Sequence, residues 1–315
     1  MSALTNTLSV LDASVYNSTG YFFVVLGILI SIRFLGFPDL TVDGSFTVGA
    51  ALYAVGIKAS FPVVVAFLMA WGAGLLAGCM TAAVNEVLKI GKIISSVLVM
   101  LFLITLTPYL TQGSTVGLLN GSHWLASVER WDLAFTRSLV PGSDFSWHLG
   151  FNLLLGLACL IATLLAGRFF VTRLGIQIRY LGSAKSPGLL EKPRRKWLLF
   201  LGLAVGNAFV ALGGAIEAER HGGFNQNMGV GVILIGLASL ILGESLVKTR
   251  KKRDNLRVSE CLVAVIVGVI VYATLLQILL WAGLTFLDVR LTTTAFLLLL
   301  LAFASRRYPN SARLF

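Results

Sequence analysis

The chain has 315 residues, of which 57% are hydrophobic and 12% are charged, and its mean hydropathy is +0.88. This apolar content exceeds what one soluble core of that length can bury, so a soluble globular protein is excluded and part of the surface must face lipid. The net charge of +11 does not indicate a nucleic-acid-binding protein, because the basic residues lie between apolar runs and form no stripe with aromatic residues.

Apolar runs long enough to cross a bilayer as helices recur along the whole chain. We expect about nine of them, within a range of about eight to ten, in an all-α polytopic membrane bundle that forms a single domain over residues 1–315. The predicted segments are 20–36, 40–57, 62–84, 93–112, 149–172, 197–216, 229–247, 258–281 and 288–305. The stretch 1–19 contains no Lys or Arg, so we expect it to be retained as an extracytoplasmic N-terminal segment.

Basic residues concentrate in alternate loops of this pattern. Most of the 25 Lys and Arg residues fall in four stretches, 85–92, 173–196, 248–257 and 306–315. The opposite side receives only Lys58, Arg130, Arg137, Arg220 and Arg290. Because basic loops remain in the cytoplasm, the sequence predicts a multi-pass protein of the bacterial inner membrane, with the N-terminus outside and the C-terminus inside.

The stretch FPDLTVDGSFTVGAA, residues 37–51, places Pro38, Asp39, Asp43 and Gly44 between two apolar runs, where a helix would be interrupted. Irregular backbone at membrane depth is tolerated only where it faces protein or a water-filled cavity. The stretch is therefore a candidate for the inner part of a solute path or its gate. An ordinary loop in which Asp39 caps the next helix explains the same residues equally well.

Glycine pairs four residues apart occur in two of the predicted segments. Gly74 and Gly78 form one pair, and Gly202 and Gly206 form the other. Because residues i and i+4 share a helix face, each pair predicts close approach of a neighbouring helix.

The longest outer segment, residues 113–148, mixes Gly, Ser and Asn with Trp124, Trp131 and Trp147. We expect it to form a folded extracytoplasmic cap. Its tryptophans are typical anchors of the membrane interface, and docking of a partner protein is the alternative.

A second polar patch covers residues 217–231 and contains Asn225 and Asn227. These side chains are candidates for an outer vestibule, although a solvated loop is the simpler account. Glu244 lies at the predicted inner end of the next helix, beside a basic run, and we expect it to be a structural charge partner of that run. A proton relay is the alternative role for Glu244.

The inner loop 173–196 begins and ends with basic residues, whereas its middle, Leu181–Leu190, is small and apolar. The positive-inside rule explains the basic residues at the two ends of this loop, but it does not explain its apolar middle. Each leucine left in water would forgo about 1.5–3 kcal/mol of burial, so we expect this middle to form a short helix that enters a groove on a soluble partner. Packing on the chain's own inner surface is the alternative.

The sequence carries no motif of an enzyme. It contains no P-loop, no HExxH and no GxSxG, so an intrinsic ATPase is excluded and no catalytic residue is expected. The cysteines lie singly in apolar segments, without disulfide or metal-ligand spacing, at Cys79, Cys159 and Cys261. We expect no metal and no cofactor in this chain.

Residues 37–51, 179–216 and 223–246 resemble the permease subunits of ABC importers in the branched-chain amino acid and ribose permease superfamily, closest to the tryptophan/tyrosine-type branch. Order and spacing agree from about Gly20 to Phe303. In that family the inner loop is the coupling segment and usually reads GxNPExAxxxGI. This chain departs from the pattern, because no acidic residue adjoins Pro187.

The resemblance implies an importer subunit that forms the path for a small organic solute, such as an amino acid. It also implies a second permease copy, two cytosolic ATP-binding subunits that bind the ATP, and an extracytoplasmic substrate-binding protein. An ion-coupled secondary transporter is the main alternative; it requires acidic groups near the bilayer midplane, whereas the acidic residues here, Asp39 and Asp43 included, are expected near the inner ends of their helices.

Two sets of site residues follow. The residues expected to couple the chain to the ATPase are Leu181, Gly182, Ser183, Pro187, Gly188, Leu189, Leu190 and Glu191. The residues expected in the translocation path or its gate are Asp39, Asp43, Ser45, Asn207, Glu217, Asn225 and Asn227.

Overall fold

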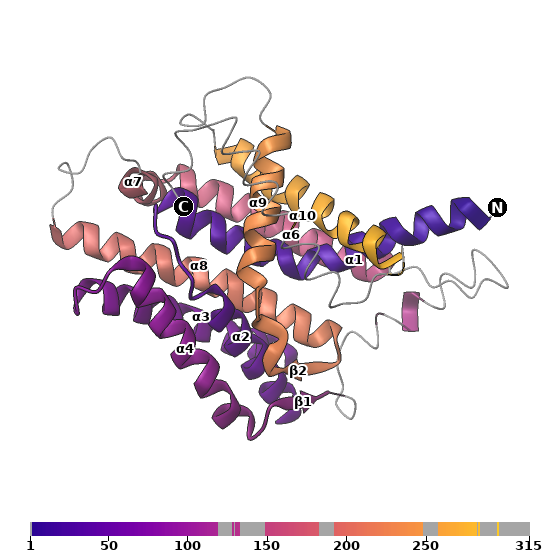
Figure 1. Cartoon of the computed structure of the whole chain (residues 1–315), viewed down its shortest axis with the longest axis horizontal. Coiled ribbons are helices and arrows are strands. Elements are labelled where there is room, and N and C mark those ends of the chain that lie inside the picture. The colour runs from indigo at the N-terminus through magenta and orange to yellow at the C-terminus, as the bar shows by residue number, and fades with distance from the viewer. Residues whose placement is uncertain are drawn as a thin grey trace.

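A computed structural model describes residues 2–118, 128, 130–132, 149–182, 192–247, 258–281, 283 and 295. The helices are α1 (Ser2–Ile28), the π-helix η1 (Leu29–Phe34), α2 (Val42–Lys58), α3 (Val63–Glu86), α4 (Lys92–Thr111), α6 (Leu149–Val171), α7 (Arg173–Gly182), α8 (Lys192–Arg220), the 3-10 helix η2 (Gln226–Gly229), α9 (Val232–Val247) and α10 (Val258–Trp281). Two short strands, β1 (Thr115–Gly117) and β2 (Gly223–Asn225), pair antiparallel. Apart from this small ladder, the described elements are helical, as the sequence predicts (Figure 1).

Seven described helical segments are long and apolar enough to cross a membrane. They are Asp12–Phe34, Val63–Glu86, Lys92–Thr111, Gly150–Val171, Pro193–Arg220, Gln226–Val247 and Val258–Trp281. The predicted segment 40–57 corresponds to α2, which has only 17 residues. The predicted segment 288–305 lies outside the described residues, and so does most of the predicted cap 113–148.

Helix α8 is the central element of the bundle, and it runs across the molecule from α7 to the β1–β2 ladder (Figure 1). We call the end of the bundle at α7 the α7 end and the opposite end the β end. At the α7 end, Lys196 of α8 approaches Glu86 of α3, with 4.0 Å between Nζ and Oε2. At the β end, a core of small side chains from α2, α3 and α8 packs under Val116 and Phe224 of the two strands.

Glycines set the close approach of α3 to α8. A methyl group at Gly74 would collide with the backbone of Asn207 and Ala208, and one at Gly78 would collide with Leu203. The other predicted pair, Gly202 and Gly206, faces η1 and α1, with Leu35 and Ser31 directly against them. Both predicted pairs are therefore packing surfaces, and α8 is contacted closely on two sides.

The outer faces of α3, α4 and α6 remain apolar and exposed within the single chain. Examples on these three helices are Leu68, Leu76, Leu98, Leu157 and Leu164. Exposed apolar side chains in this number on spanning helices match a lipid-facing or protein-facing role. The fold therefore agrees with the membrane class predicted from composition.

Gly74→Ala should destabilise the bundle, because the added Cβ meets backbone atoms of α8 that cannot move aside without separating the helices. Overpacking of this kind costs about 1–3 kcal/mol. The apparent melting temperature of the detergent-solubilised protein should fall relative to Gly72→Ala, the matched control on the same helix, whose new methyl group meets nothing within 4 Å. Equal melting temperatures for the two variants would contradict the packing described here.

Candidate functional site

The break between η1 and α2 places irregular backbone inside the bundle. After η1, residues 35–41 form neither helix nor strand, and α2 begins only at Val42. Gly36 adopts a φ of +60°, which favours glycine, and the Phe37 N–H donates to the Ser31 carbonyl at 2.9 Å. Phe37 is fully buried. The segment is thus held inside protein, which is the condition for irregular backbone at membrane depth.

Asp39 is the centre of a buried polar cluster. One carboxylate oxygen accepts from the Thr41 N–H at 2.9 Å, and the other accepts from Nδ2 of Asn207 at 2.7 Å. The amide oxygen of Asn207 in turn accepts from the Ser45 hydroxyl at 2.6 Å. Asp39, Ser45 and Asn207 are each at most 1% exposed. The cluster unites three predicted site residues from distant parts of the sequence.

Hydroxyl groups extend this cluster toward α3 and α4. The Thr41 hydroxyl lies 2.7 Å from that of Thr81, and it lies 3.4 Å from the Ser96 carbonyl. Thr41, Thr81 and Ser96 are completely buried. None of the three was predicted, since a lone Ser or Thr in an apolar segment gives no signal by itself.

Asp43 ties the start of α2 to the start of α9. Its two carboxylate oxygens accept from the backbone N–H of Gly231 at 3.0 Å and of Ile233 at 2.8 Å. These N–H groups have no intrahelical partner, because they belong to the first turn of α9. A carboxylate at this position also offsets the positive end of the helix dipole. Asp43 therefore acts as the N-terminal cap of a helix nearly 190 residues away in the sequence.

This geometry corrects the predicted depth of Asp39 and Asp43, which the sequence analysis placed near the inner ends of their helices. Asn207, the partner of Asp39, lies near the middle of the span Pro193–Arg220. Asp43 is two residues from Ser45, which contacts the same asparagine. Both aspartates therefore lie near the middle of the bundle, because residues 35–41 run back from the α7 end before α2 begins.

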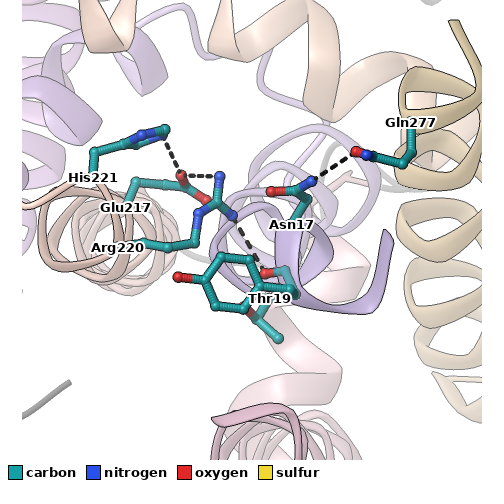
Figure 2. A network of polar contacts seen from close by, with 7 residues as sticks. Asn17, Thr19, Glu217, Arg220, His221 and Gln277 are labelled. Carbon is teal, nitrogen blue, oxygen red and sulfur yellow. Dashed lines mark hydrogen bonds and ion pairs between the residues drawn. The ribbon is translucent and has the colours of Figure 1, made fainter. Parts of the chain in front are cut away.

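A second charged cluster lies at the β end of α8, as Figure 2 shows. Glu217 is 2% exposed in its side chain and pairs with Arg220 at 2.9 Å and with Nε2 of His221 at 3.3 Å. The Arg220 guanidinium also lies over the Tyr16 ring, 5.3 Å from its centroid. Gly20 of α1 leaves the space that the Glu217 carboxylate occupies. The cluster locks α8 to α1.

The remaining predicted residues at the β end, Asn225 and Asn227, belong to neither of these clusters. Asn225 ends β2, and its side chain accepts from the Asn227 N–H at 2.8 Å, which starts η2. Both asparagines are exposed in the single chain. Sequence reasoning missed Glu219, a buried acid that accepts from the Tyr53 hydroxyl at 2.7 Å. Residues two positions apart lie on different faces of a helix, so the spacing of Glu217 and Glu219 could have predicted two separate contacts.

At the α7 end, Glu244 pairs with Arg33 of η1, with 3.2 Å between Oε1 and Nε. The basic run that was expected to pair with Glu244 lies outside the described residues. Leu181 and Gly182 end α7. The other predicted coupling residues lie outside the described residues, namely Ser183, Pro187, Gly188, Leu189, Leu190 and Glu191. Among the described residues, no group of three or more His, Cys, Asp or Glu could hold a metal ion.

Comparison with known proteins gives a consistent result. A family model described as the permease component of branched-chain amino acid transport systems matches residues 10–305. A tyrosine transport system permease protein of Clostridioides difficile is 28% identical over 284 residues, which cover 89% of this chain and 86% of that protein. An uncharacterized protein of Rickettsia prowazekii is 28% identical over 269 residues, covering 85% of this chain and 88% of its own length. No solved structure matches the chain.

Asp43→Ala should loosen the first turn of α9, because the Gly231 and Ile233 N–H groups lose their acceptor. Loss of a cap costs about 0.5–2 kcal/mol, so amide exchange in that turn should accelerate about 2- to 30-fold. Hydrogen exchange followed by mass spectrometry in lipid nanodiscs measures this. Asp43→Asn retains one oxygen acceptor and should give a smaller effect. Unchanged exchange in Asp43→Ala would show that Asp43 is not the cap of α9.

Proposed function

Because the chain belongs to the family of branched-chain amino acid transport system permease components, we propose that it is the membrane subunit of an ATP-binding-cassette importer. In this proposal its cargo is an amino acid or a related compound, a choice supported by the similarity to a tyrosine transport permease. Its partners are a second copy of the chain, two cytosolic ATP-binding subunits and an extracytoplasmic substrate-binding protein. The chain itself supplies the path and the docking surface.

The observation that carries this proposal is the polar cluster at the centre of the bundle. Two helices, α2 and α9, begin there, and their first turns meet at Asp43. Interrupted helices at membrane depth are the usual framework of a solute path, because they offer backbone and side-chain polar groups without exposing them to lipid. Asp39 and Ser45 both hydrogen-bond to Asn207, and in this proposal the three side chains gate the path.

The alternative of an ion-coupled secondary transporter requires an acidic group near the midplane that can bind a cation or proton. Asp39 lies there, but both of its oxygens accept hydrogen bonds from Thr41 and Asn207. Both oxygens of Asp43 likewise accept hydrogen bonds, from backbone N–H groups at the start of α9. These hydrogen bonds favour structural roles for the two carboxylates and therefore favour an ATP-driven importer.

The proposal is tested by reconstituting the chain in proteoliposomes, with and without the ATP-binding subunit and the substrate-binding protein that the proposal assigns to it. We expect uptake of labelled tyrosine or another amino acid only with all components and ATP. Uptake by the purified chain alone, driven by a proton or sodium gradient, would establish the secondary transporter instead.

The orientation can be measured with two single cysteines in a background that lacks Cys79, Cys159 and Cys261. Ser60→Cys lies in the exposed turn between α2 and α3 at the β end, whereas Lys89→Cys lies in the exposed turn between α3 and α4 at the α7 end. Since the α7 end carries the basic loops, an impermeant thiol reagent should label Ser60→Cys in intact cells and Lys89→Cys only after permeabilisation. The reverse pattern would invert the topology.

Replacing both Leu189 and Leu190 with Asp should release the ATPase subunit. The reason is that a charge placed in an apolar groove of the partner loses its hydration without gaining a counterion, so recovery of the ATPase should fall about tenfold or more. Co-purification with the tagged permease measures the effect. Phe61→Asp is the control, because it places a charge on a half-exposed aromatic position at the β end. Equal recovery with both proteins would remove Leu189 and Leu190 from the coupling surface.

A further inference from the structure

The end of α7 rests directly on the break that follows η1. A methyl group added at Gly182 would lie 2.7 Å from the carbonyl carbon of Leu35 and 2.8 Å from the backbone nitrogen of Gly36. A methyl group at Gly36 would in turn lie 3.2 Å from the Gly182 Cα. Two backbones therefore touch without intervening side chains. Displacement of either backbone must displace the other, since no flexible side chain is present to absorb the movement.

Aromatic packing prevents α7 from sliding over this contact. The Arg179 guanidinium lies over the Phe34 ring, 5.7 Å from its centroid, and Phe34 packs against Phe170 of α6 with 4.4 Å between ring centroids. Ile178 is 1% exposed, and Gly175 lies against the backbone of Phe170. Helix α7 is thus held against α6 near its start and against η1 near its end, so that it can move as one body.

The two ends of the predicted coupling segment are also tied together. Arg194, in the first turns of α8, donates from Nε and from one terminal nitrogen to the Gln177 side-chain oxygen of α7, at 3.1 and 2.9 Å. These bonds join α7 to the start of α8. A force applied to this segment by a partner acts on the stem formed by α7 and the start of α8.

From Gly36 the chain leads in three residues to Asp39. Lys92 of α4 donates to the Gly36 carbonyl at 3.0 Å and lies over the Phe37 ring, 5.6 Å from its centroid. On the other side of the break, Arg33 holds α9 through Glu244. Residues 33–37 are therefore joined to α4, α7 and α9 at once. A π-helical turn such as η1 is rare and is found frequently at functional sites.

We propose that the Gly36–Gly182 contact is the joint that carries movement of the coupling segment to the central polar cluster. The proposal rests on the proposed function, since it presupposes an ATPase partner that moves residues 173–196. When α7 is displaced, residues 34–37 shift with it, and Asp39 and Thr41 separate from Asn207 and Thr81. Gly36 and Gly182 are positioning residues in this scheme, because they act on the path through Asp39.

The test compares ATP hydrolysis and solute uptake in the same proteoliposomes, using the complete complex of permease, ATPase and binding protein. Gly182→Ala inserts a methyl group into the joint, whereas the control Gly72→Ala makes the same change where nothing lies within 4 Å. We expect the complex assembled with Gly182→Ala to consume at least about threefold more ATP per solute than the unmodified complex. A purely structural defect would lower both rates together and leave this ratio unchanged.

A second variant covers the case in which Gly182→Ala does not assemble. Arg179→Gln removes the cation from the Phe34 ring without adding bulk, and it should raise the same ratio to a smaller extent. An unchanged ratio in Arg179→Gln, or in an assembled Gly182→Ala, would overturn the joint while leaving the importer intact. Absence of ATP-driven uptake in the unmodified complex would instead overturn the proposed function.

Discussion

The fold depends on satisfying the backbone of helices that begin inside a membrane bundle. Each helix start leaves up to four N–H groups without an intrahelical acceptor, and water is not available at that depth. Here the Thr41 N–H finds Asp39, and the Gly231 and Ile233 N–H groups find Asp43. Each carboxylate faces the positive end of a helix and is stabilised by it.

Helix α8 supplies the side chain that holds this buried cluster together. Its Asn207 bridges Asp39 and Ser45, and its own Nδ2 is additionally shared with the Leu203 carbonyl one turn earlier. The glycines of α3 and of α8 bring the neighbouring backbones close enough to exclude water from the bridge. In this low-dielectric setting a hydrogen bond is stronger than in water, but a missing partner is also more costly. The cluster is thus stable only while it is complete.

The local parts of this arrangement can be predicted from the sequence, whereas contacts between residues far apart in the sequence cannot. Apolar runs give the spanning helices, and the Pro38–Gly44 stretch gives the break, because both are local patterns. The bond between Asp39 and Asn207 joins residues 168 positions apart, so no local pattern reports it. Similarly, Glu244 adjoins a basic run in sequence but reaches Arg33 in space. The ladder of β1 and β2 escaped prediction, since three-residue strands carry no measurable periodicity.

The two ends of the bundle differ in how firmly their charges hold them. At the β end the pair of Glu217 and Arg220 is almost fully buried, and breaking such a pair costs about 3–5 kcal/mol. At the α7 end Glu86 pairs with Lys89 and Lys196, whose side chains are 69% and 48% exposed, and such pairs contribute about 0–1 kcal/mol each. The pairs of Glu86 at the α7 end therefore cost little to rearrange, whereas Arg33 and Glu244 at the same end are 20% and 10% exposed and hold η1 to α9 more firmly. Residues 33–37 connect this firmer contact to the central cluster through Asp39.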